Sequence, residues 1–98
     1  MDTKYETSWG VFVWDEDKNA KNLSKHKVDF LAAVEVFRDP FAVLHYDSEH
    51  SEQEERFSII GIVRERFVLV VIFTDRDDLT RIISARRATQ EEKNEYER

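Results

Sequence analysis

Apolar residues recur in this chain with two different periods, and the change of period divides it into a helical part and a stranded part. Within residues 29–38, four apolar residues repeat with the period of an α-helix and predict a core-facing stripe: Phe30, Ala33, Val34 and Phe37. Asp29 precedes the stripe as an N-cap, and Pro40 follows it. Because the residue before a proline is displaced from the helical region, this helix is expected to end at 38–39.

An earlier helix is predicted from Asp15 to His26, after a short strand over residues 11–14 that is apolar on both faces. Asp15 suits the N-cap position, and Ala20 and Leu23 are expected to face the core. Acidic residues gather at the start of this helix and basic residues at its end. Each end therefore carries the charge that the helix dipole favours.

The second half of the chain has the short apolar runs of β-strands. Four strands are predicted, over residues 41–46, 56–63, 66–74 and 80–85. Strands that follow one another through short turns pair antiparallel and form a meander. The predicted fold is therefore α+β, with two N-terminal helices packed on a small antiparallel sheet. A C-terminal helix opens with a capping box from Thr89 to Glu92 and is too polar to belong to the core.

A length of 98 residues fits a single domain over 1–98 with one hydrophobic core. Residues 1–10 are expected to form a loosely ordered N-terminal extension. The chain has no cysteine and no signal-peptide pattern, and its longest apolar run, residues 67–73, has the length of a strand. These features predict a cytoplasmic protein without disulfides and without contact with a membrane.

The formal net charge of -6 and the pI near 5.0 argue against a protein that coats nucleic acid non-specifically. A local exception is the basic group of Arg81, Arg86 and Arg87, which has no acidic residue within it. Strand alternation would place Arg81, Ile83 and Ala85 on one face. Arginine suits an anionic ligand, because its planar fork binds phosphate. The alternative is that these arginines pair with carboxylates of the chain itself.

Histidines supply candidates for proton transfer. His26 lies between two lysines at a helix end, where it can move a proton near neutral pH or complement the helix dipole. His45 and His50 could be read as metal ligands together with the acids between them. A flexible acidic loop gives them no fixed geometry, so a solvated loop is the better interpretation. Glu55 and Arg56 stand at a strand entrance, either as a base and its neighbour or as charges that flank an apolar strand.

Familiar catalytic signatures are missing from the sequence. It contains no P-loop, no carboxylate set with metal-binding spacing and no serine-hydrolase motif. If the chain cleaves phosphodiesters, the simplest chemistry needs no metal and uses the 2′-hydroxyl of RNA as the nucleophile. Arginine could stabilise the charge that develops in that transition state.

Five sequence blocks occur in an order that resembles one protein family. They are residues 14–18 (WDEDK); Asn22-Leu23 and Lys25-His26 followed by Val28 and Phe30; Phe37 with Asp39-Pro40; residues 54–57 (EERF); and Arg81 to Thr89. Over roughly residues 11–97, the chain is similar to the BrnT family, the toxin half of bacterial BrnT/BrnA type II toxin–antitoxin pairs.

The resemblance implies a RelE-like fold and a ribonuclease that inhibits translation by cleaving RNA. No cofactor or metal is expected, because the sequence lacks the motifs that would hold one. It also implies that a BrnA-like ribbon-helix-helix antitoxin is the partner that neutralises the toxin. The pair would repress its own operon, so operator DNA would be contacted only through the antitoxin.

Carried onto this chain, the family pattern marks Lys25 and His26, Glu55 and Arg56, and Arg81 with Arg86. We assign the roles, and add Arg87, from the chemistry of the side chains. The catalytic candidates are His26 for proton transfer, Glu55 as a base or an orienter of an arginine, and Arg81 with Arg86 for phosphate binding and transition-state charge. The RNA-binding candidates are Lys25, Arg56 and Arg87.

Two departures from the family pattern bear on activity. Lys27 stands where such sequences usually have the glycine that ends the helix in a left-handed conformation, which predicts a different presentation of His26. Asp75, Asp77 and Asp78 place acidic charge beside the arginines. An alternative function is therefore a catalytically degenerate homologue that binds the antitoxin and acts as a co-repressor.

Overall fold

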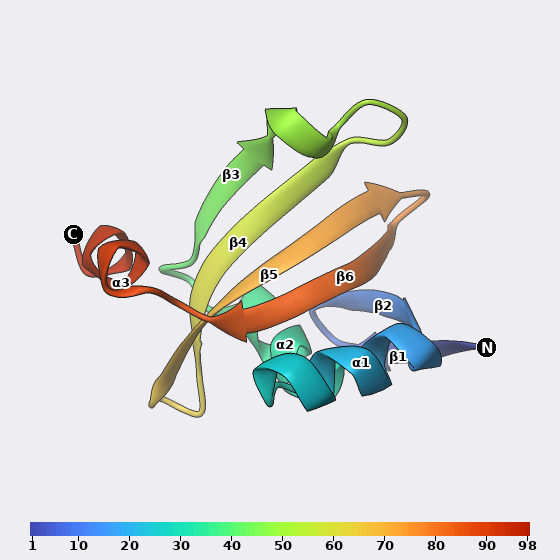
Figure 1. The fold of residues 1–98 in the computed structure, drawn as a ribbon, viewed down its shortest axis with the longest axis horizontal. Coiled ribbons are helices and arrows are strands. Elements are labelled where there is room, and N and C mark those ends of the chain that lie inside the picture. Colours follow the sequence, from blue (N-terminus) through green and yellow to red (C-terminus); the bar gives the residue numbers. More distant parts are fainter.

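Six β-strands form one mixed sheet in the computed structural model, which describes all 98 residues (Figure 1). The strands are β1 (Asp2–Thr7), β2 (Gly10–Asp15), β3 (Val43–Asp47), β4 (Arg56–Val63), β5 (Phe67–Arg76) and β6 (Leu79–Arg87). Their order across the sheet is β1-β2-β6-β5-β4-β3. The helices are α1 (Glu16–His26), α2 (Phe30–Ala33) and α3 (Gln90–Tyr96), with 3-10 helices η1 (Val34–Arg38) and η2 (Ser48–His50). None of these helices has the length and apolar character needed to cross a membrane.

The pairing of β2 with β6 is parallel, so the predicted antiparallel meander is only partly correct. Strands β3 to β6 pair antiparallel in chain order, as expected. Strand β2 joins the other side of β6 in parallel, with Val11 opposite Leu79 and Val13 opposite Arg81. The apolar pattern of a strand carries no signal for its partner, which explains the error. The α+β class is confirmed, and the small antiparallel sheet is corrected to a six-stranded mixed one.

Residues 1–10, predicted to be loosely ordered, contain a strand. β1 pairs antiparallel with β2 along its length, from Asp2 opposite Asp15 to Thr7 opposite Gly10. This strand is polar and largely exposed, so its sequence lacks the apolar alternation of a half-buried strand. Backbone pairing with β2, rather than burial, gives it its order.

Helix α1 begins and ends as predicted but turns a different face to the sheet. Asp15 caps it by accepting a hydrogen bond from the Lys18 amide (3.1 Å). Ala20 and Leu23, predicted to face the core, are exposed. Asn22 is buried instead, with 6% of its surface accessible. A polar residue in the buried stripe is what misled a prediction based on apolar spacing.

The second N-terminal helix is shorter than predicted, because its last part winds more tightly. Asp29 caps α2 as expected, but the α-helix ends at Ala33 and η1 continues from there. η1 approaches β4 so closely that a Cβ on Gly61 would lie 2.8 Å from Cγ1 of Val36. The expected pair of N-terminal helices and the RelE-like arrangement therefore do not describe this layer well.

The hydrophobic core lies between these helices and one face of the sheet, called the inner face below (Figure 1). The predicted helical stripe belongs to it, because Phe30, Ala33 and Val34 are fully buried. Phe37 completes an aromatic cluster, with ring centroids 5.0 Å from Phe12 and 4.9 Å from Phe73. Offset and edge-on aromatic pairs of this kind add to the stabilisation from burial.

A β-bulge in β6 changes which side chains share a face. The register between β5 and β6 shifts at Ile83, which has no residue opposite it. Ile82 and Ala85 are both buried in the core as a result, although an unbroken strand would place them on opposite faces. The predicted sharing of a face by Arg81 and Ala85 is therefore wrong. Arg81 and Arg86 belong to the face away from the core, called the outer face below.

The carboxamide of Asn22 replaces a missing strand beside β6. β2 pairs with β6 only as far as Arg81, which leaves the β6 backbone near Ala85 without a strand on that side. Asn22 Nδ2 donates to the carbonyl oxygens of Ala85 and Val28, both at 2.8 Å, and its Oδ1 accepts from the Ala85 amide at 3.1 Å. One side chain thus satisfies three buried backbone groups and fixes α1 to the sheet.

We predict that Asn22→Ala lowers the free energy of unfolding by about 2–4 kcal/mol, because it leaves buried donors and acceptors without partners. Urea denaturation followed by circular dichroism measures this loss. Lys21→Ala is the matched control, since Lys21 is exposed on the same helix, and it should change stability by less than about 0.5 kcal/mol. Equal effects of the two substitutions would contradict the structural role of Asn22.

Candidate functional site

A row of polar side chains crosses the outer face of the sheet. Arg56 of β4 lies opposite Thr74 of β5, and Thr74 lies opposite Arg81 of β6. The side chains of directly paired residues project from the same face of the sheet. Because neighbouring strands are about 4.8 Å apart, the backbones of the two arginines are separated by roughly 10 Å. Two guanidinium groups thus border one strip of the outer face.

A cavity of about 610 Å³ opens on the same strip. Strand residues Arg56, Thr74, Arg76 and Ile83 line it together with the loop that precedes β4. The cavity carries both signs of charge, from arginines of the strands and glutamates of the loop. Its size is within the range of small-molecule sites, so one nucleotide unit of a larger ligand could enter it.

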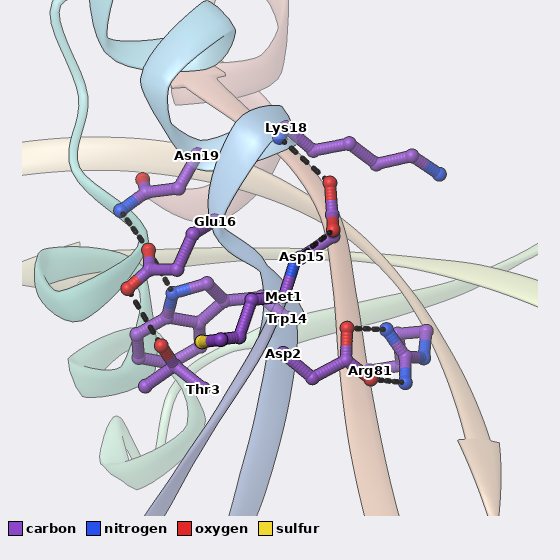
Figure 2. A network of polar contacts seen from close by, with 9 residues as sticks. All are labelled: Met1, Asp2, Thr3, Trp14, Asp15, Glu16, Lys18, Asn19 and Arg81. Carbon is purple, nitrogen blue, oxygen red and sulfur yellow. Dashed lines mark hydrogen bonds and ion pairs between the residues drawn. The ribbon is translucent and has the colours of Figure 1, made fainter.

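Arg81 is paired with a carboxylate from the N-terminal strand (Figure 2). Its Nη2 donates to Oδ2 of Asp2 at 2.7 Å, and its Nη1 donates to Oδ1 at 3.5 Å. This contact raises the pKa of Arg81 above its usual value and lowers the pKa of Asp2. The side chains of Arg81 and Asp2 are 39% and 50% exposed, so water screens the pair and it adds little stability.

Arg86 is held more firmly, by the C-terminal helix. Its Nη1 and Nη2 donate to the two carboxylate oxygens of Glu92 at 2.7 and 2.9 Å. Glu92 also accepts from the Thr89 amide at 2.8 Å and so completes the predicted capping box, which is confirmed. The hydrogen bond from Arg86 is the main cause that lowers the pKa of Glu92 to about 2. Arg86 therefore anchors α3 as well as facing outward.

Two further contacts fix α3 to the strands. The Tyr96 hydroxyl donates to Oδ2 of Asp39 at 2.6 Å, and the same oxygen accepts from the Ile62 amide at 2.8 Å. Burial, followed by this hydrogen bond, raises the pKa of Tyr96 to about 12. Burial acts on Asp39 in the opposite sense to its hydrogen bonds, which together prevail and lower its pKa. Oε2 of Glu95 also lies 2.5 Å from Nε2 of His45.

The three histidines lie in different surroundings. His26 is half-buried at the end of α1, the helix packed on the inner face. His50 lines the outer-face cavity beside Arg56, and its Nδ1 lies 2.9 Å from a carboxylate oxygen of Asp47. His45 faces α3 instead. His45 and His50 thus pair with different carboxylates and do not form one ligand cluster.

Several predicted site residues lie away from the outer-face row. Lys25 is exposed on α1, and the Arg87 guanidinium lies 4.5 Å from the ring centroid of Phe67. Glu55 is exposed in the loop before β4, and its neighbour Glu54 lines the cavity in its place. The predicted residues therefore divide into an outer group of Arg56, Arg81 and Arg86, and a second group of Lys25, His26 and Arg87 at the ends of α1 and β6.

Both departures from the family pattern have structural explanations. Lys27 adopts the left-handed conformation (φ 61°), and its amide donates to the Leu23 carbonyl at 3.0 Å, so α1 ends as it would with glycine. Asp77 and Asp78 also have positive φ values, 52° and 65°, and form the two-residue turn between β5 and β6. Aspartate tolerates this conformation better than most residues, so these acids build the hairpin.

Four contributors to the outer face were missed in the sequence: Asp2, and His50, Thr74 and Arg76, which line the cavity with Arg56. The pairing of Asp2 with Arg81 joins residues 79 positions apart, a separation at which local pattern is silent. The alternation of Thr3, Tyr5 and Thr7, which all favour strands, is the one signal that could have revealed β1. Nothing local indicates that His50 turns toward the cavity.

The contacts of α3 predict that its docking weakens at both extremes of pH. The pKa of Glu92 is lowered from 4.5 to about 2, so its stabilisation is complete above the unfolded value and is lost as the pH falls toward 2. The pKa of Tyr96 is raised from 10.0 to about 12, so its stabilisation is complete below pH 10 and is lost as the pH rises through 12. Urea unfolding across pH measures both.

The stability difference between wild type and Glu92→Gln should shrink only in acid. That between wild type and Tyr96→Phe should shrink in alkali, and also in acid once Asp39, which accepts the hydrogen bond, is protonated. In alkali, Glu92→Gln serves as the control for Tyr96→Phe, because the two contacts lie in the same helix. Differences that stay constant across the whole pH range would contradict these assignments.

Comparison with known proteins identifies the family and a similar fold. The model of the family described as "Ribonuclease toxin, BrnT, of type II toxin-antitoxin system" matches residues 14–92. The crystal structure of the Brucella abortus ribonuclease toxin BrnT is similar, with a TM-score of 0.63, 29% identity, and coverage of 79% of this chain and 94% of that one. No curated protein matches the chain significantly. The matched residues include strands β3 to β6 and helices α1 and α2 in full, and the chain belongs to the BrnT family of ribonuclease toxins of type II toxin–antitoxin systems.

Proposed function

We propose that this chain is a metal-independent endoribonuclease that binds RNA on the outer face of its sheet. The observation that carries the proposal is the row formed by Arg56, Thr74 and Arg81 beside a cavity. Guanidinium groups bind phosphate through two donors and stabilise the negative charge that develops when a phosphodiester is attacked. Two arginines roughly 10 Å apart across the strands could engage neighbouring parts of an RNA backbone.

In the proposed reaction, the 2′-oxygen of RNA attacks the adjacent phosphorus while the bond from phosphorus to the 5′-oxygen breaks. A base removes the 2′-hydroxyl proton, and an acid protonates the departing 5′-oxygen. The products are a 2′,3′-cyclic phosphate and a 5′-hydroxyl. Arg81 and Arg56 neutralise the charge on the non-bridging oxygens of the phosphate. Arg86, through its contact with Glu92 of α3, holds β6 in place.

Proton transfer has two candidate histidines. The family pattern marks Lys25 with His26 and also Glu55. In this alternative His26 transfers the proton, Glu55 acts as a base or an orienter, and Lys25 and Arg87 are nearby RNA contacts. Geometry favours His50, because it lines the cavity with Arg56 and is oriented by Asp47. A carboxylate that holds one ring nitrogen fixes the tautomer and leaves the other nitrogen free for a proton. Variants of the two histidines separate the alternatives.

A type II toxin has a protein antitoxin as its partner, and we propose a BrnA-like ribbon-helix-helix protein in that role. An exposed apolar strip on the edge strand β3 and the turn before it supports such a contact, with Phe41 76%, Leu44 59% and Tyr46 54% exposed. The adjoining loop, residues 47–55, is acidic and favours a basic partner segment. The complex would contact operator DNA only through the antitoxin.

A second candidate function is a degenerate toxin that serves only as an antitoxin-binding co-repressor. One observation favours it: both Arg81 and Arg86 are already paired with carboxylates of the chain. Such a protein would bind the antitoxin and leave RNA intact under all conditions. Cleavage by the purified protein distinguishes this alternative from the proposed ribonuclease.

We predict that the purified chain cleaves RNA equally with and without EDTA and leaves 2′,3′-cyclic phosphate ends. Arg81→Ala and Arg56→Ala should each lower the cleavage rate at least roughly tenfold, the scale of removing one transition-state donor. Arg98→Ala removes the same charge from an exposed terminal position and should change the rate less than about twofold. His50→Ala is expected to reduce cleavage more than His26→Ala.

Loss of cleavage in EDTA would contradict the metal-independent mechanism. Full activity in both Arg81→Ala and Arg56→Ala would contradict the outer-face site, and a larger loss in His26→Ala would move proton transfer to the end of α1. No cleavage by folded wild-type protein would favour the co-repressor function.

A further inference from the structure

Strand β1 lies before the residues that define the family, because the family model begins at Trp14 and β1 ends at Thr7. β1 is an edge strand of the sheet and lies outside the residues that the family model matches. That strand contributes little to the core, since most of it is exposed. Its most specific contact is the one that Asp2 makes with Arg81.

Several contacts hold the N-terminus in the position that this pairing requires (Figure 2). The Glu16 amide donates to the Met1 carbonyl at 2.9 Å, and the Met1 ammonium lies 3.4 Å from Oδ1 of Asp15. Thr3 Oγ1 donates to Glu16 at 2.6 Å. Asp2 lies between these anchors with its side chain directed across β2 to Arg81. The carboxylate is thus positioned by its neighbours and does not sample the surface at random.

The Asp2 carboxylate occupies the donors that a phosphate would use. It takes hydrogen bonds from both Nη1 and Nη2 of Arg81, the two-donor geometry in which arginine binds carboxylate and phosphate alike. The pair is half-exposed, so water screens it and it is weak. An RNA phosphate can therefore displace it, at a cost that lowers the observed affinity.

The pairing of Arg86 with Glu92 is different in kind. Glu92 is only 25% exposed and also closes the capping box of α3, so displacing it would disturb a helix. Asp2 is in contact with no other cation through its side chain. Of the two paired arginines on the outer face, Arg81 is the one whose partner can be exchanged.

We propose that Asp2 is an intramolecular competitor for the RNA phosphate at Arg81, so that the N-terminal strand sets the affinity of this toxin for RNA. This inference rests on the proposed function, since it takes Arg81 as a phosphate-binding residue. It makes β1 a determinant of substrate affinity, although β1 lies outside the matched family region.

The test compares Asp2→Asn with Glu6→Gln. Both substitutions remove one negative charge from β1, and Asp2 and Glu6 are two pleats apart on the same face. Glu6 contacts only Lys4, at 3.7 Å. Binding is measured by fluorescence anisotropy with a 2′-O-methylated RNA oligonucleotide, which lacks the proposed nucleophile and stays intact.

We expect Asp2→Asn to tighten RNA binding about two- to fivefold, the range that a weak pair screened by water allows. Glu6→Gln should change it less than about 1.5-fold. In an Arg81→Ala background, the effect of Asp2→Asn should fall to that of Glu6→Gln, because the competitor then has no site to occupy. Thermal unfolding of each variant verifies that β1 remains in place.

The outcomes separate this inference from the proposed function. If Arg81→Ala does not weaken RNA binding, the outer-face site itself is wrong. If Arg81→Ala weakens binding but Asp2→Asn behaves like Glu6→Gln or weakens binding too, the site stands and the competitor role of Asp2 is overturned. A gain from Asp2→Asn that persists in the Arg81→Ala background would overturn it as well.

Discussion

The backbone of β6 is completed on one side by two different partners, and the rest of the molecule depends on that division. β2 pairs with β6 as far as Arg81, and the Asn22 carboxamide then takes over at Ala85. Because β2 stops pairing in the middle of β6, Asn22 of α1 can bind the rest of β6, which holds α1 against the inner face. The same division also makes β2, a strand of the N-terminal hairpin, a neighbour of Arg81. The same arrangement leaves the outer face of β4, β5 and β6 for a ligand.

The positions of individual charged side chains matter more for this protein than its net charge. The chain carries a formal net charge of -6, yet Arg56 and Arg76 line the outer-face cavity, and Arg81 lies on the neighbouring strand opposite Thr74. Carboxylates from the chain's two ends pair with the arginines of β6: Asp2 with Arg81, and Glu92 with Arg86. An acidic surface limits non-specific attraction to RNA, so binding would depend on a few guanidinium groups in fixed positions. Such a design suits an enzyme that releases its product more than a protein that coats nucleic acid.

Local signals predicted the local structure well. The N-cap at Asp15, the capping box at Thr89 and the bounds of β4 are confirmed, because each depends on residues a few positions apart. Features that depend on distant partners were missed or misplaced. These are the parallel pairing of β2, the bulge at Ile83, the burial of Asn22 and the contact of Asp2 with Arg81. Among the site residues, the arginines of β6 carried a compositional signal, whereas His50 required the fold to reveal its neighbour Arg56.

Mapping of the RNA-binding surface by nuclear magnetic resonance is the most direct test of whether RNA binds the outer face of the sheet. Backbone amide shifts of the ¹⁵N-labelled protein would be followed on addition of the 2′-O-methylated RNA. If RNA binds there, the largest shift changes are expected at residues that the strand register places on the outer face, namely Ser58, Thr74, Arg81 and Ser84. Little change is expected at the end of α1. Changes centred on Lys25 and His26, with the outer strands unaffected, would contradict binding at the outer face.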